Sequence, residues 1–309
     1  MKFSLTLIFA FLMIFLSSCN STSLIKIEET VINLNIKTSD KNKNLIIESL
    51  LKNDQKFTIN FQNENAYFLE DNILNSRLNY FCKGFINDQR DTLEKIIFKN
   101  KNFNDRKVLV VYLKEQENLA NELKEKYPSE DYYLLNEVNF ETQIKTLLDI
   151  DASFSRFLTL SKLDNNIQIS HTPRIKNNIA SIYFLMDYEN GKTIMPIFRS
   201  YAFEIDFYSS SEIFHDALDY KKLIDFEKTY IPFTNSMIET IANENDYTLE
   251  EKIILALIND YVEIEKIYQN NLFRKNYKLK SGNNIVRRNN CINRDLNLWQ
   301  ISSDNFNQT

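Results

Sequence analysis

The sequence predicts an α/β fold, and three observations lead to this prediction. Residues 107–113 and 179–186 are nearly continuous apolar runs, which are typical of strands buried on both faces of a parallel sheet. Segments with helical periodicity lie between the predicted strands, and such alternation indicates an α/β fold. Only 3 glycines and 4 prolines occur in 309 residues, so long flexible linkers and low-complexity disorder are not expected.

Before the first apolar run, the pattern predicts two strands and two helices. Residues 31–36 and 57–61 alternate apolar and polar side chains, as strands with one buried face do. Residues 45–51 suit a short helix. Residues 88–99 carry apolar side chains along one helical face and predict a second helix.

The clearest local unit is a strand, a helix and a second strand. Residues 107–113 form the first strand, and residues 115–127 form an amphipathic helix that Pro128 ends. Residues 132–135 supply the next strand. A unit of this kind joins two parallel strands by a right-handed crossover.

The alternation continues through most of the remaining chain. Helices are expected at 139–149, 153–163, 192–201 and 249–270, and strands at 179–186 and 203–208. Two such α/β layers joined near the middle of the chain would form a cleft between them.

The first residues predict an exported protein with a lipid anchor. Lys2 precedes an apolar run over residues 5–16, and Ser17, Ser18 and Cys19 follow directly. The run is too short to span a hydrocarbon core of ~30 Å, which needs about 20 residues. Small residues before a cysteine are typical of a bacterial lipoprotein signal. An ordinary secretory signal with an incidental cysteine is the alternative interpretation.

The lipoprotein signal sets the predicted domain organisation. We expect residues 1–18 to be removed, Cys19 to carry the lipid, and residues 19–30 to form a tether. A single domain of two lobes would then occupy residues 31–309. Asn20 favours the outer membrane, facing the periplasm, because lipoproteins retained at the inner membrane usually have Asp at that position.

Charge and cysteine content limit the partners and the covalent structure. The chain has 37 basic and 42 acidic residues and a formal net charge of −5, which argues against nucleic acid as a partner. Apart from Cys19, cysteines occur only at positions 82 and 291. An envelope compartment permits a disulfide, but two cysteines about 200 residues apart do not specify one. We therefore favour two buried free thiols over a bridge.

Few patterns of reactive side chains are present. Glycines only at positions 84, 191 and 282 exclude a dinucleotide-binding fingerprint and a phosphate-binding loop. His171 and His215 are the only histidines, and neither a His-Glu-x-x-His nor a Cys-x-x-Cys motif occurs. No serine lies in a Gly-x-Ser-x-Gly elbow. We expect no metal, no cofactor and no catalytic residues.

Two weaker groups of polar residues are candidates for a site. Glu141, Asp149 and Asp151 could form paired acids, but Asp151 fits better as the N-terminal cap of the following helix. Residues 209–212 offer three serine hydroxyls and a glutamate after a strand, where α/β proteins bind ligands. A turn that caps the next helix is the simpler interpretation of that segment.

A third group is basic. Arg287, Arg288 and Arg294 could form a patch for acidic polymers or membrane head groups. A solvated strand-and-turn edge is the simpler interpretation. None of the three groups resembles an active site, so the chain is not expected to be an enzyme.

Several segments in consistent order carry a family resemblance. Residues 144–156 read Ile-Lys-Thr-Leu-Leu-Asp-Ile-Asp-Ala-Ser-Phe-Ser-Arg, and Pro173-Arg174 precedes the strand at 179–186 with Asn178 before it. Further matches lie at residues 205–214, at 220–232, and at 294–302, which contains Trp299. Read together, these segments resemble the penicillin-binding-protein activator family, the LppC lipoproteins. There a helix ending in Leu-Gly-Ile continues into a Ser-x-x-Arg helix, and a Pro-Arg-x-x-x-Asp-Ile segment enters a buried strand.

The resemblance covers roughly residues 105–305 and implies both a fold and a function. The implied fold is that of type I periplasmic binding proteins, with two lobes of parallel sheets around a cleft. The implied function is that of an outer-membrane lipoprotein that binds and activates a class A penicillin-binding protein, and so regulates peptidoglycan synthesis without catalysis.

Two departures from the family change these expectations. The helical-repeat domain that members usually carry is not expected here, since only about 12 residues separate Cys19 from the first strand, a reach of ~40 Å when extended. The first lobe is also expected to be reduced, because the glycine-containing opening strand and turn are missing before residue 100.

Two rival functions make different structural predictions. An envelope-anchored small-molecule receptor would use the cleft between the lobes, and requires a concave pocket with polar groups at the ends of the predicted strands. An envelope hydrolase requires a tight cluster of acids or nucleophiles around Asp149, Asp151, His171 or His215.

Overall fold

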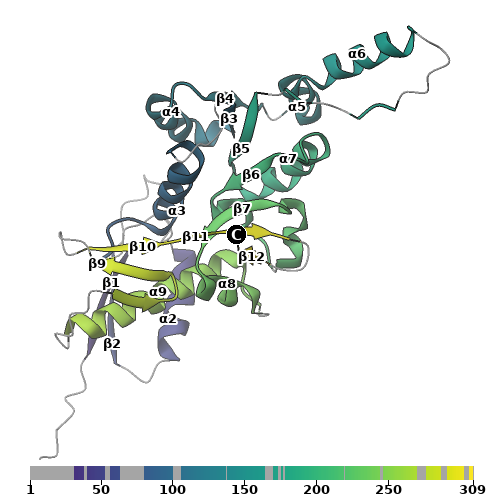
Figure 1. The fold of residues 1–309 in the computed structure, drawn as a ribbon. Coiled ribbons are helices and arrows are strands. Elements are labelled where there is room, and N and C mark those ends of the chain that lie inside the picture. Colours follow the sequence, from purple (N-terminus) through teal and green to yellow (C-terminus); the bar gives the residue numbers. More distant parts are fainter. Residues whose placement is uncertain are drawn as a thin grey trace, which may run out of the picture.

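A seven-stranded sheet in the order β12-β11-β7-β6-β5-β3-β4 forms the centre of the computed structural model (Figure 1). Its strands are β3 (Lys107–Tyr112), β4 (Asp131–Leu134), β5 (Ile179–Leu185), β6 (Asp206–Ser209), β7 (Thr229–Phe233), β11 (Asn297–Ile301) and β12 (Phe306–Gln308). The structure describes residues 31–37, 40–52, 56–62, 80–99, 106–136, 138–163, 170–172, 175–176, 178–218, 220–243, 246–269, 276–286, 291–302 and 306–308.

The sheet is mostly parallel, as predicted. Strands β4, β3, β5, β6 and β7 run parallel to one another, and β11 runs antiparallel to β7 and β12. Along β3, Val108 and Val110 belong to one hydrophobic cluster, and Leu109 and Val111 belong to another. Helices cover both faces of the sheet, so successive side chains are all buried. This two-sided burial accounts for the continuous apolar run in the sequence.

One face of the sheet is covered by α3 (Phe85–Glu94), the π-helical turn η2 (Lys95–Lys99) and α4 (Glu117–Lys126), and the 3-10 turn η3 (Lys114–Gln116) precedes α4. The other face is covered by α5 (Phe140–Leu148), α7 (Tyr188–Tyr201), the 3-10 helices η4 (Ser211–Phe214) and η5 (Tyr220–Phe226), α8 (Asn235–Ala242) and α9 (Leu249–Gln269). The helices predicted at 115–127, 139–149, 192–201 and 249–270 correspond to α4, α5, α7 and α9. The predicted α/β class is therefore confirmed.

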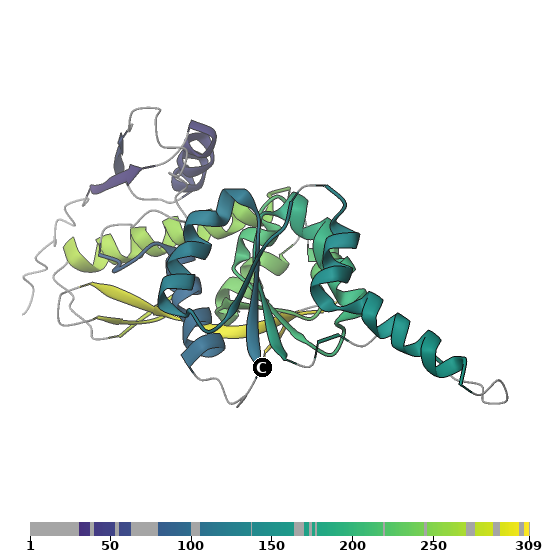
Figure 2. The same cartoon turned by 90° about the horizontal axis from the view of Figure 1, so that it is seen from above.

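A second, smaller parallel layer lies beside α9 (Figure 2). Strand β1 (Ile32–Lys37) pairs in parallel with β2 (Phe57–Gln62), and α2 (Asp40–Leu51) connects them. Leu34 and Ile36 of β1 are buried in the main hydrophobic cluster. The layer has two strands in the described part of the chain.

Helix α6 (Ile150–Ser161) projects away from the rest of the molecule (Figures 1 and 2). Only Asp149 separates it from α5, and that residue has a left-handed backbone conformation with φ of 62°. This conformation ends α5 and starts α6 at once, three residues before the predicted start at 153. Asp151 consequently lies inside the first turn, so its prediction as the helix cap was wrong.

A small antiparallel sheet extends the large one. It contains β8 (Asn276–Leu279), β9 (Gly282–Val286) and β10 (Ile292–Asp295), in the order β10-β9-β8. Leu296 alone separates β10 from β11, so one stretch of chain belongs to both sheets. Gly282 has a φ of +146°, which permits the tight turn before β9, and a Cβ there would lie 3.1 Å from the Asp295 carbonyl oxygen.

Cys82 and Cys291 form a disulfide, so the expectation of two free thiols was wrong. The backbone brings the two residues together, with a Cα–Cα distance of 5.0 Å across a sequence separation of 209. The Cys82 N–H donates to the Ile292 carbonyl at 2.8 Å, and the Ile292 N–H donates to the Tyr80 carbonyl at 2.6 Å. This short parallel bridge places the cysteines beside each other.

None of the helices in the described ranges is both long enough and apolar enough to cross a membrane.

Candidate functional site at the carboxyl ends of the strands

The carboxyl ends of β6 and β7 are the place where an α/β protein of this kind would hold a ligand. The predicted serine segment lies there: β6 ends at Ser209, and Ser210 leads into η4. All three serines are buried. Leu113 after β3 and Met186 after β5 are buried as well. The strand ends are therefore covered by the protein's own side chains.

Gln89 of α3 joins two of these strand ends. Its Nε2 donates to the Pro232 carbonyl at 2.7 Å, and its Oε1 accepts from the Ser211 N–H at 3.1 Å and from the Ser211 hydroxyl at 2.9 Å. The side chain is fully buried. Gln89 thus occupies positions at which a polar ligand would bind.

Arg90, the next residue of α3, closes the same edge further out. Its Nη2 lies 2.8 and 3.1 Å from the two carboxylate oxygens of Glu212, and the Ser210 hydroxyl donates to Glu212 at 2.7 Å. Both charged side chains are about three-quarters buried, with 20% and 25% of their surfaces exposed. The predicted hydroxyl-and-acid segment is therefore paired within the protein.

Ser211 also contacts His215, with 3.1 Å between Oγ and Nε2. A serine hydroxyl has one proton, and here it points to Oε1 of Gln89, whose orientation is fixed because its amide nitrogen donates to the Pro232 carbonyl. His215 must then donate to the serine and cannot act as its base. Burial lowers the pKa of His215, which keeps the ring neutral. This pair does not have the arrangement of an activated nucleophile.

The other predicted residues do not converge. His171 lies beside α6, with its Nε2 3.4 Å from the Ser153 hydroxyl. Asp149 lies 3.9 Å from Arg156, which is an exposed ion pair. Glu141 pairs with a lysine and accepts from a tyrosine hydroxyl, and the lysine lowers the pKa of its carboxyl. In the described residues, no group of three or more His, Cys, Asp or Glu side chains is placed to hold a metal.

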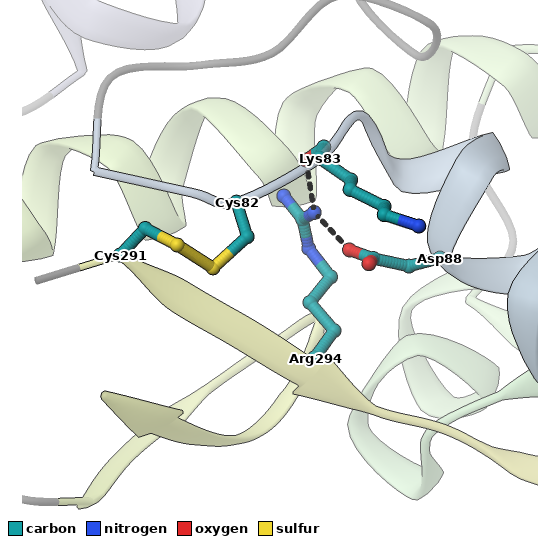
Figure 3. The surroundings of a disulfide bond; sticks show 5 residues. All are labelled: Cys82, Lys83, Asp88, Cys291 and Arg294. Atoms are coloured by element: carbon teal, nitrogen blue, oxygen red, sulfur yellow. Dashed lines mark hydrogen bonds and ion pairs between the residues drawn. A yellow bond between two sulfur atoms is a disulfide. The ribbon is translucent and has the colours of Figure 1, made fainter. Parts of the chain in front are cut away.

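Arg294 is buried, so the prediction of a surface patch or solvated edge was wrong (Figure 3). Its Nη1 pairs with Asp88 of α3 at 2.7 Å and donates to the Lys83 carbonyl at 3.2 Å. Its Nε donates to Ser281 at 3.1 Å. The guanidinium lies 4.1 Å from the centre of the Phe81 ring. Arg287 and Arg288 lie outside the described residues.

Two grooves among the described residues lie away from the covered strand ends. One, of about 950 Å³, lies between α3 and β10 and is lined by Lys83, Asp91, Glu94, Lys99 and Asp295 among others. Another, of about 480 Å³, lies at the opposite, amino ends of the strands and is lined by Arg106, Lys176 and Glu204. At the carboxyl ends, where the receptor hypothesis required a pocket, the described polar side chains are paired within the protein.

Sequence reasoning identified residues 209–212 but missed Gln89, Arg90 and Asp88. These three consecutive polar residues of α3 make the contacts that close the strand ends and hold β10. The signal was present, because Asp88, Gln89 and Arg90 stand in a helix whose apolar residues Phe85, Ile86 and Leu93 are buried around them. Polar residues within such a stripe indicate buried partners.

The fold and the site define an α/β domain in which the described residues at the carboxyl ends of β6 and β7 are covered by the protein's own side chains. No protein-family model and no curated protein matches the sequence. Solved structures do match. Full-length LpoA from Haemophilus influenzae aligns with 91% of this chain and 59% of its own, at 10% identity and a TM-score of 0.54. A second crystal form aligns with 93% of this chain and 60% of its own, with a TM-score of 0.52.

These likenesses show that the chain shares its fold with the full-length LpoA structures. The chain spans about three-fifths of the full-length LpoA structures that it matches. The C-domain of the same protein, described as a regulator of PBP1A, aligns with 90% of this chain and 82% of its own, at 11% identity and a TM-score of 0.48.

Proposed function

We propose that this chain is a lipoprotein of the outer membrane that regulates peptidoglycan synthesis by binding and activating a class A penicillin-binding protein. It acts through protein contact and without catalysis. Its lipid is attached to Cys19, and its folded part faces the periplasm.

The observation that carries this proposal is the likeness of fold to full-length LpoA over 91% of the chain. The ordered family motifs support it independently, because they were identified from the sequence alone. In the structure, residues 144–156 span the junction of α5 and α6, and Trp299 lies on β11. The predicted lipoprotein signal, residues 1–18 followed by Cys19, supports a location in the cell envelope.

The covered strand ends favour a contact-based function over the rivals. Gln89 and Arg90 fill the edge where a receptor would hold its ligand. The hydrogen-bond directions around Ser211 oppose its use as a nucleophile. Both observations support a protein that binds its partner through its outer surface rather than through a cleft.

The test of this proposal uses the full chain, purified in detergent, and the periplasmic part of a class A penicillin-binding protein from the same organism. We expect direct binding and faster glycan polymerisation or cross-linking by the synthase. A class B penicillin-binding protein serves as the control and should not respond. Absence of both binding and any change in synthase activity would refute the proposal.

The anchor is tested separately in cells. Cys19→Ser should abolish incorporation of labelled palmitate and release the protein from the membrane fraction. Asn20→Asp is the matched control, because it should leave the lipid in place and move the protein to the inner membrane. Palmitate labelling of the Cys19→Ser variant would contradict the assignment.

A further inference from the structure

Helix α6 exposes large apolar side chains to solvent. The exposed fractions are 48% for Phe154, 40% for Leu158, 54% for Leu160 and 76% for Leu163, which directly follows the helix and its last turn. Phe154 and Leu158, four positions apart, share one side of the helix, and the half-buried Phe157 lies between them and Leu160. Four exposed apolar residues within ten positions differ from the single ones found on most surfaces. We call these four residues the α6 patch.

The helix has little support from the rest of the protein. Only Ile150 and Ser153, both in its first turn, are buried. His171 packs on Phe154 and Phe157, with ring centres 5.5 and 4.9 Å apart. A helix of 12 residues is marginal in water unless an apolar face packs against something. Within the described part of the chain, α6 is therefore supported at its first turn and by His171, while the α6 patch stays largely exposed.

Charges at the edge of the α6 patch indicate the kind of partner. Two bases, Arg156 and Lys162, flank the α6 patch; Arg156 forms an exposed ion pair with Asp149 at 3.9 Å, which is weak enough for a carboxylate of a partner to replace. Arg156 and Leu160 lie four residues apart on one flank, and Leu158 and Lys162 lie four apart on the other. A complementary surface is an apolar groove with acidic residues at its rim.

The position of α6 argues against lipid as the occupant. Residues 1–30, which carry the proposed anchor, lead into β1, and β1 and α6 lie at opposite ends of the molecule (Figures 1 and 2). A membrane that holds the chain near β1 is therefore remote from the α6 patch.

We propose that the α6 patch is the docking surface for the protein partner, and that it inserts into an apolar, acid-rimmed groove on the periplasmic part of the penicillin-binding protein. This inference rests on the proposed function. It places the contact at the end of the molecule opposite β1, on the side away from the strand into which the proposed anchor leads.

The test compares Leu158→Asp and Leu160→Asp with Leu218→Asp in the full chain. Leu218 is the matched control, since it is 58% exposed and lies outside α6. Each α6 variant should weaken binding to the class A synthase at least about tenfold, as central contact residues do. The control should change it by less than about twofold. Arg156→Glu should weaken binding less and should reduce its dependence on salt.

The outcomes separate the two proposals. If the unaltered chain binds no class A synthase, the proposed function fails and this inference fails with it. If the unaltered chain binds and both α6 variants bind equally well, only this inference is overturned. Self-association lost in Leu160→Asp would assign the patch to a second copy, and loss of binding to phosphatidylethanolamine–phosphatidylglycerol vesicles would assign it to lipid. Either result overturns the inference. Circular dichroism and thermal unfolding verify that each variant is folded.

Discussion

Helices α3 and α6 have opposite relations to the protein around them. Helix α3 buries polar side chains, with Asp88 and Gln89 almost fully enclosed and each bonded to a distant part of the chain. Helix α6 exposes apolar side chains and buries two residues. Burial of polar groups carries a large cost unless every one is paired, so α3 is committed to a single arrangement. Burial of the exposed apolar side chains of α6 against another surface would be favourable.

The comparison indicates where function lies in this fold. Side chains of α3 cover the edge of the sheet at which a binding protein would hold its ligand. The exposed apolar surface is on α6. Stability and recognition are therefore expected to respond to changes in different helices. The following predictions test that separation, beginning with the largest effect.

Removal of Asp88 should destabilise the protein most. Asp88→Ala leaves the Arg294 guanidinium buried without its anion, which costs about 3–5 kcal/mol of unfolding free energy. Urea unfolding at neutral pH measures the loss, and Asp88→Asn serves if the alanine variant does not fold. Asp91→Asn removes only the exposed ion pair with Lys83 and should cost at most about 1 kcal/mol. Equal losses in the two variants would contradict the central role of Asp88.

Loss of the disulfide should rank second. Cys82→Ser with Cys291→Ser frees a loop of about 210 residues and should cost about 2–4 kcal/mol. Thermal unfolding with and without a reducing agent provides the measurement. The reducing agent should lower the melting temperature of the unaltered protein and leave that of the double variant unchanged. An identical response of both proteins would mean that the bond adds nothing to stability.

Gln89→Leu should have an intermediate effect. It removes the donor to the Pro232 carbonyl and the acceptor for Ser211, and leaving buried polar groups unpaired costs about 1–3 kcal/mol. The exposed neighbour Asn87 provides the control on the same helix, and Asn87→Ala should change stability by less than about 0.5 kcal/mol. A cost for Gln89→Leu no larger than that of the control would remove α3 from its proposed role.

Leu160→Asp should have the smallest effect on stability, within about 0.5 kcal/mol, because the side chain is already in water. Leu93 of α3 is the contrasting leucine, since it is fully buried and Leu93→Ala should cost about 2–5 kcal/mol. Urea unfolding of the two variants side by side measures the difference. A large loss in Leu160→Asp would show that α6 is part of the core.

The sequence predicted elements best where the physical environment repeats along the chain. The strands at 107–113 and 179–186 were identified because burial on both faces makes every position apolar. The long helix α9 was identified because its apolar stripe recurs at helical spacing. In both cases the same burial recurs at regular positions, so it appears in the sequence as a regular pattern of apolar residues.

Contacts between distant residues leave no such pattern, and there the predictions were wrong or absent. Gln89 meets Pro232 across 143 positions, and Arg294 meets Asp88 across 206. Without knowledge of its distant partner, Arg294 resembles an ordinary surface residue. Cys82 in the same way resembles an ordinary free thiol. The left-handed conformation of Asp149, which displaced the predicted cap at Asp151, is a single backbone choice that the side-chain pattern does not record.

The bond between Cys82 and Cys291 also bears on the order of events during the proposed export. Cys291 follows Cys82 by 209 positions, so in an exported chain Cys82 stays a thiol until those residues have crossed the membrane as well. The chain has three cysteines, and a free Cys19 would offer a competing partner throughout that wait. Attachment of lipid to Cys19, as proposed, would remove this competitor and leave a single correct pairing for the oxidation machinery to make.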